Sequence, residues 1–119
     1  MKKIVVLGAS PDPERYAYQA VISLVKLNYL VFPLGIRPGF IGNLPIITDK
    51  PVIEDVDTLL LYLRPERQKE WLDYIVMRKP KRIIFNPGTE NPELIKRCKE
   101  NDLDMVFGCT LVMICLGRF

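Results

Sequence analysis

The residues with the clearest chemical potential follow the first apolar run of the chain, and they read Gly8-Ala9-Ser10-Pro11. The run itself, Lys3–Leu7, is rich in β-branched residues and predicts a buried strand, and the segment after the turn predicts a helix. A glycine turn between a strand and a helix lets backbone N–H groups and the helix N-terminus face an anion. We therefore expect this turn to hold a pyrophosphate, with the Ser10 hydroxyl as an additional donor. An ordinary strand-to-helix turn is the alternative.

The turn does not match either of the common phosphate-binding fingerprints. The dinucleotide pattern G-x-G-x-x-G would require glycines at positions 10 and 13, where Ser10 and Pro13 stand. A Walker loop would require Gly-Lys-Ser/Thr, which does not occur in the chain. The turn alone therefore indicates an anion without naming the nucleotide.

The segment after the second predicted strand carries a basic residue where NAD-binding units usually carry an acid. It reads Pro33-Leu34-Gly35-Ile36-Arg37-Pro38 and contains no Asp or Glu. An acid at this point would hold the ribose hydroxyls of NAD, whereas a guanidinium pairs with phosphate. We expect Pro33, Gly35 and Arg37 to contribute to a site for coenzyme A or NADP, both of which carry a phosphate on the adenosine ribose. A solvent-facing loop arginine is the alternative.

Two later segments also fall at predicted strand ends. Arg64, in Leu63-Arg64-Pro65-Glu66, faces either the ligand or solvent. Asn86, Pro87 and Gly88 precede a predicted helix, so their backbone and amide groups suit phosphate or pantetheine contacts. A well-capped turn is the alternative at this second segment.

These candidate residues are positioned by strands and helices that alternate along the chain. Such alternation predicts an α/β fold, a single Rossmann-like doubly wound sheet of about five mainly parallel strands with helices on both faces, in one domain over 1–119. The ligand crevice of such a sheet lies at the carboxyl ends of its strands. The predicted strands are Lys3–Leu7, Tyr29–Leu34, Thr58–Leu63, Arg82–Phe85 and Leu103–Phe107, with a short extended piece around Pro45–Thr48. Helices are predicted to begin at Asp12-Pro13-Glu14, Pro65-Glu66 and Asn91-Pro92-Glu93, and a last one to cover Cys109–Leu116.

Composition excludes several kinds of chemistry. The 119 residues include no histidine, which removes Ser-His and Cys-His catalytic pairs, histidine metal sites and any phosphohistidine step. A net charge of +3 is too mild to indicate a nucleic-acid-binding protein. No apolar run approaches the ~20 residues of a membrane span. Three cysteines without a CxxC pair predict reduced thiols in the cytoplasm, with Cys98 and Cys115 in the core. Cys109, at the start of the last helix, is expected to be a small buried residue, and a reactive thiol is the alternative.

The candidate stretches taken together resemble the small stand-alone CoA-binding proteins, which are similar to the first domain of the succinyl-CoA synthetase alpha subunit and of ADP-forming acyl-CoA synthetases. The matching stretches span most of the chain and include Gly8–Pro11, Arg15–Ala17, Pro33–Gly35 with Arg37, Val56–Thr58, Asn86–Thr89 and Gly108–Thr110. The resemblance implies that Gly8, Ala9 and Ser10 hold the CoA pyrophosphate and that Arg37 lies near the adenosine phosphate. The family often has Asn-Pro-Lys where this chain has Gly35-Ile36-Arg37.

The resemblance also implies a binding module rather than an enzyme, because the catalytic histidine of the synthetases lies in a further domain and this chain contains no histidine. We therefore expect a protein that binds coenzyme A or an acyl-CoA. An NADP-binding, reductase-like protein is one alternative. A regulatory subunit that docks on an acyl-CoA enzyme is another, with the apolar segment Leu111–Phe119 as its docking face or as a homodimer face.

Overall fold

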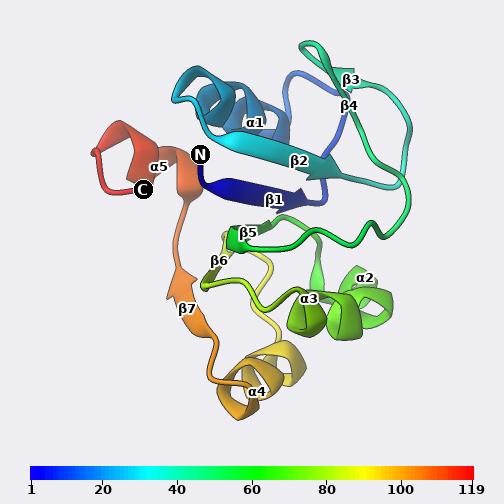
Figure 1. Ribbon diagram of the computed structural model, residues 1–119, viewed down its shortest axis with the longest axis vertical. Coiled ribbons are helices and arrows are strands. Elements are labelled where there is room, and N and C mark those ends of the chain that lie inside the picture. The colour runs from blue at the N-terminus through cyan, green and yellow to red at the C-terminus, as the bar shows by residue number, and fades with distance from the viewer.

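The computed structural model describes residues 1–119 and shows one five-stranded parallel sheet between two layers of helices (Figure 1). The order of its strands is β2-β1-β5-β6-β7, and every neighbouring pair is parallel. The α/β, Rossmann-like class expected from the sequence is confirmed. The strands are β1 (Lys3–Leu7), β2 (Leu30–Leu34), β5 (Val56–Leu61), β6 (Arg82–Phe85) and β7 (Asp104–Phe107).

The apolar runs form strands that are buried on both faces, because helices cover each side of the sheet. Val5 and Leu7 of β1 face the core beneath α3 (Leu72–Arg78) and α4 (Pro92–Glu100). Ile4 and Val6 face the opposite core, beneath α1 (Tyr16–Lys26) and α5 (Thr110–Cys115). All four of these strand residues are fully buried. Alternate side chains therefore anchor two separate helical layers, which Figure 1 shows above and below the sheet.

The strand order reverses at β1, whose neighbours are β2 on one side and β5 on the other. The connection through α1 turns one way from β1, and the later connections run the other way (Figure 1). This arrangement leaves the loops after β1 and β5 diverging, which opens a crevice at the carboxyl ends of the strands. The short helix α2 (Pro65–Gln68) follows β5 at this edge.

The stretch between β2 and β5 is mostly irregular, and its prediction is confirmed only in part. A small antiparallel hairpin forms from β3 (Phe40–Ile41) and β4 (Leu44–Pro45). Ile47 then pairs with Leu34 in an isolated parallel bridge, which covers the outer edge of β2. The extended piece expected around Pro45–Thr48 is therefore shorter than predicted.

The first helix begins later than the sequence suggested. Asp12-Pro13-Glu14 was expected to start it, but the Asp12 carboxylate accepts a hydrogen bond from the Glu14 N–H at 3.0 Å and closes a tight turn instead. Helix α1 starts only at Tyr16, after Arg15 in extended backbone geometry. Asn91, by contrast, caps α4 as predicted, because its side chain accepts from the Glu93 N–H at 3.1 Å.

The three cysteines differ in exposure. Cys98 is fully buried between α4 and the sheet, as expected. Cys109 is half-buried just before α5. The prediction that Cys115 lies in the core is wrong, because the last turn of the short helix α5 is exposed.

No helix of the structure has both the length and the apolar character that crossing a bilayer would require.

Thiol labelling of the native protein should distinguish these environments. Burial raises the pKa of Cys98 from 9.0 to about 11, so its thiol is both shielded and protonated at neutral pH. We expect a maleimide to modify Cys115 rapidly and Cys98 only after unfolding, as read by peptide mass spectrometry. Equal labelling rates at the two positions in the native state would contradict this packing.

Candidate functional site

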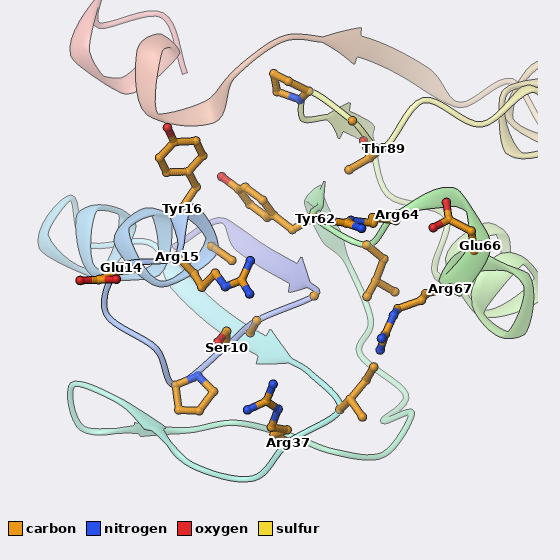
Figure 2. Close-up of a pocket in the computed structure, with 18 residues that line it drawn as sticks. Ser10, Glu14, Arg15, Tyr16, Arg37, Tyr62, Arg64, Glu66, Arg67 and Thr89 are labelled. Atoms are coloured by element: carbon orange, nitrogen blue, oxygen red, sulfur yellow. The ribbon is translucent and has the colours of Figure 1, made fainter.

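A cavity of about 990 Å³ opens at the carboxyl ends of the strands, where the loops diverge (Figure 2). Each of the four loop segments expected at the crevice contributes to its lining. Nine of the twelve residues predicted as ligand contacts lie around it: Gly8, Ala9, Ser10, Pro11, Arg15, Arg37, Arg64, Pro87 and Gly88. The tertiary structure therefore brings together residues that are separated by up to 80 positions in the chain.

The other three predicted residues, Pro33, Gly35 and Asn86, are buried and do not line the cavity. Asn86 is only 2% exposed, and its side chain is fully engaged. Its amide nitrogen donates to the Leu61 carbonyl at 3.2 Å, and its amide oxygen accepts from the Thr110 N–H at 2.8 Å. Asn86 therefore ties the end of β6 to β5 and to α5, which makes it a support of the site wall.

Two glycines allow the phosphate turn to pack closely against the neighbouring strand ends. A Cβ atom at Gly35 would lie 2.3 Å from the Ala9 carbonyl oxygen, which no side chain can tolerate. Gly8 has a φ of +102°, and a Cβ there would lie 2.9 Å from the backbone of Tyr62. The turn can therefore occupy its position only because both residues lack a side chain.

The free N–H donors around the turn differ from those expected. The N–H groups of Gly8 and Ala9 both donate to the Leu34 carbonyl, at 2.9 and 2.8 Å, so they are already satisfied within the protein. The first amides of α1 have no such partner, because Arg15 provides no side-chain cap. Tyr16 and Ala17, which carry these amides, line the cavity. The uncapped N-terminus of the eleven-residue helix α1 therefore provides the free backbone donors of this cavity, with Ser10 beside them.

Four arginines surround the cavity, whose lining includes only two acids, Glu14 and Glu66. Arg15 and Arg37 approach from the side of α1 and β2, and Arg64 and Arg67 from the side of α2 (Figure 2). The one ion pair among them joins Arg15 to Asp12 at 3.9 Å, and both groups are largely exposed. The guanidinium groups are thus available to an anionic ligand.

A buried amide holds the α2 side of the cavity to the loop after β6. The Gln68 side chain is fully buried, and its nitrogen donates to the carbonyls of Leu63 and Thr89, each at 2.8 Å. Its oxygen accepts from the Asn91 side chain at 3.0 Å. Every polar atom of this amide is satisfied, so α2 and the 86–91 loop form a continuous, fixed wall.

Three further residues of the site, Gln68, Arg67 and Tyr62, were not predicted from the sequence. Arg67 could have been found from its i, i+3 spacing to Arg64, which places both side chains on one face of a helix start. Tyr62 directly follows β5 and lines the cavity, and its hydroxyl is buried beside the Thr110 side chain. Burial raises the pKa of Tyr62 to about 12, so it presents a neutral phenol at physiological pH.

Replacing Gly35 with alanine should disrupt the turn. The added methyl group would meet the Ala9 carbonyl oxygen, and backbone on both sides would have to move. We expect Gly35→Ala to lower the free energy of unfolding by about 1–3 kcal/mol, as measured by urea denaturation. Gly108→Ala is the matched control, because nothing lies within 4 Å of a Cβ there and its change should stay within about 0.5 kcal/mol. Equal effects of the two substitutions would contradict the close packing described above.

Solved structures share this fold closely. A crystallised protein described only as uncharacterized has 47% sequence identity and a TM-score of 0.96, and the match covers 100% of this chain and 98% of that one. A protein from Thermus thermophilus is 27% identical over 99% of this chain and 90% of its own, with a TM-score of 0.86. A hypothetical protein from Pyrococcus horikoshii is 26% identical, with a TM-score of 0.78, over 93% of this chain and 80% of its own.

Among curated proteins, none shows significant similarity to this sequence. The family model described as a CoA binding domain matches residues 2–114, which include every residue that lines the cavity. The chain therefore belongs to the CoA-binding domain family.

Proposed function

We propose that the protein binds coenzyme A or an acyl-CoA in the cavity at the carboxyl edge of the sheet and has no catalytic activity of its own. The observation that carries this proposal is the uncapped N-terminus of α1, which faces the cavity beside Ser10. Free amide groups at a helix N-terminus bind phosphate through both hydrogen bonds and the helix dipole. Membership of the CoA-binding family supports the same ligand class.

Arg37 supports a nucleotide with a phosphate on its adenosine ribose. It lies after β2, on the cavity wall, and is exposed without an acidic partner. The same position in an NAD site would carry a carboxylate for the ribose hydroxyls. With the pyrophosphate at α1, the ribose phosphate would lie toward β2 and pair with the Arg37 guanidinium.

The remainder of the ligand would extend across the ends of β5 and β6. That part of the cavity is lined by Tyr62, Leu63 and Pro87, which present apolar surface suited to a pantetheine arm. The volume of about 990 Å³ lies at the upper end of the range for pockets that enclose small molecules, so it suits a ligand as large as coenzyme A.

NADP is the second candidate, because it also carries a phosphate on the adenosine ribose and Arg37 would serve it equally. The Gly8 and Ala9 amides do not distinguish the two nucleotides, because the Leu34 carbonyl occupies them for either ligand. A subunit that docks on an acyl-CoA enzyme, or on a second copy of this chain, is the third candidate. Its docking face would include the exposed Val112 and Leu116 of the C-terminal segment. Met113 and Ile114 of the same segment pack against the core and would not contribute to that face.

Ligand-induced stabilisation should separate these nucleotides. At a ligand concentration 100 times its Kd, binding adds about 2.7 kcal/mol to the free energy of unfolding. We expect such stabilisation by coenzyme A in thermal unfolding, and weaker shifts with NADP, NAD and ATP at the same concentration. A millimolar concentration of coenzyme A that leaves the melting temperature unchanged would exclude the proposal.

Arg37→Gln should weaken the contact with the ribose phosphate specifically. Loss of a charge-assisted pair costs roughly tenfold in affinity, so Kd for coenzyme A should rise by about that factor in isothermal calorimetry. Dephospho-coenzyme A lacks this phosphate, and its Kd should be the same for the variant and the native protein. A comparable loss of affinity for both ligands would show that Arg37 contacts a part of the nucleotide other than the ribose phosphate.

A further inference from the structure

We propose that the protein self-associates through its edge strand β7, which pairs antiparallel with β7 of a second copy, so that one sheet runs through both molecules. The inference concerns the edge of the sheet that lies farthest from β2 and Arg37. No residue of β7 lines the cavity, so the inference does not rest on the proposed function.

The two edges of the sheet are finished differently. On the outer side of β2, the Ile47 N–H donates to the Pro33 carbonyl at 2.8 Å, and the Ile47 carbonyl accepts from the Gly35 N–H at 3.0 Å. The chain itself therefore covers that edge. β7 ends the strand order on the other side, and Figure 1 shows it at the margin of the molecule. An uncovered edge strand presents main-chain groups to which another strand can add.

The register of β7 shows which of its main-chain groups face outward. Phe107 lies opposite Phe85 of β6, and the Gly108 N–H donates to the Phe85 carbonyl at 3.1 Å. Because main-chain groups alternate in direction along a strand, Val106 and Gly108 point to β6, whereas Met105 and Phe107 point away from it. No turn or loop supplies a backbone hydrogen bond to Met105 or Phe107. Their N–H and C=O groups are therefore free to pair with a further strand.

The side chains of this edge are apolar and partly exposed. Phe107 is 53% exposed, although its ring stacks on that of the buried Phe85 with centroids 4.9 Å apart. Met105 and Val106 are half-buried and lie on opposite faces of the sheet. The one charged residue of the strand is Asp104, at its first position. β7 thus contains neither the lysine nor the proline with which proteins commonly protect an edge strand.

A second copy matches this edge in one antiparallel register. With the two-fold axis at Val106, Met105 pairs with Phe107 of the second copy through both main-chain hydrogen bonds, and this pair occurs twice. The methionine sulfurs then meet aromatic rings on one face, and Val106 meets its own copy on the other. Asp104 lies opposite the uncharged Gly108 of the second copy, so no like charges meet. A register centred on Met105 would instead place the Asp104 carboxylate against Val106.

The short length of β7 limits the strength of this association. Only four residues form the strand, so the pairing buries less than the roughly 1,200–2,000 Å² of a stable interface. We therefore expect a reversible dimer with a Kd in the micromolar range. Both cavities remain open in it, because β7 contributes nothing to their lining.

The test measures molar mass by sedimentation equilibrium of the ligand-free protein between roughly 1 μM and 1 mM. We expect the mass to rise from monomer to dimer. Phe107→Lys places a charge on the edge at an exposed position and should raise the Kd of the dimer at least roughly tenfold. Val112→Lys is the matched control, because Val112 is also 53% exposed but lies on α5, and this variant should dimerise as the native protein does.

Amide hydrogen exchange of the native protein gives a second measurement that needs no substitution. The amides of Met105 and Phe107 should become protected as the concentration rises through the Kd of the dimer, because only pairing with a second strand covers them. The Val106 amide, which points to β6, should change much less.

Three results would overturn the inference. A protein that stays monomeric up to millimolar concentration would leave the edge for a strand of another protein. Loss of the dimer in Val112→Lys, with retention in Phe107→Lys, would move the interface to α5. Unchanged exchange at Met105 and Phe107 in a dimeric sample would place the contact on another surface.

Discussion

The site depends on one junction, at which the Leu34 carbonyl accepts the N–H groups of both Gly8 and Ala9. This bifurcated acceptor holds the turn after β1 against the end of β2. The fit is so close that position 35 must be glycine, since a Cβ there would overlap the Ala9 carbonyl oxygen. The turn is consequently rigid, and it directs the chain so that α1 begins with its first amides unpaired and facing the cavity.

The cavity is charged at its surface and supported by neutral, fully bonded amides beneath it. Gln68 and Asn86 are buried, and each bonds to backbone groups of separate loops. Neutral amides suit this role, because a buried group whose donors and acceptors are all satisfied avoids the desolvation cost of a buried charge. The arginines can therefore stay solvated on the wall until an anion displaces water from them.

The groups that line the cavity suit the recognition of an anionic nucleotide, as proposed above. The chain has no histidine, and burial raises the pKa of Tyr62, one of the two tyrosines of the wall, to about 12, far from the range that suits proton transfer at neutral pH. The other lining groups include four arginines, the free amides of α1 and apolar side chains, which suit phosphates and an extended arm, beside only two acids, Glu14 and Glu66. This set of groups fits the CoA-binding family to which the chain belongs.

The sequence by itself determined the positions of the strands and of the four loops at the crevice, because apolar runs and caps such as Asn91 act within a few residues of the chain. Only the tertiary structure decided which donors are free. The Gly8 amide is occupied by Leu34, 26 positions later, and Gln68 joins two loops through hydrogen bonds that no local pattern records. Hydrogen bonds between distant segments depend on the strand order, so the free donors lie at the start of α1 and not in the turn, and Arg67 lines the cavity with Arg64.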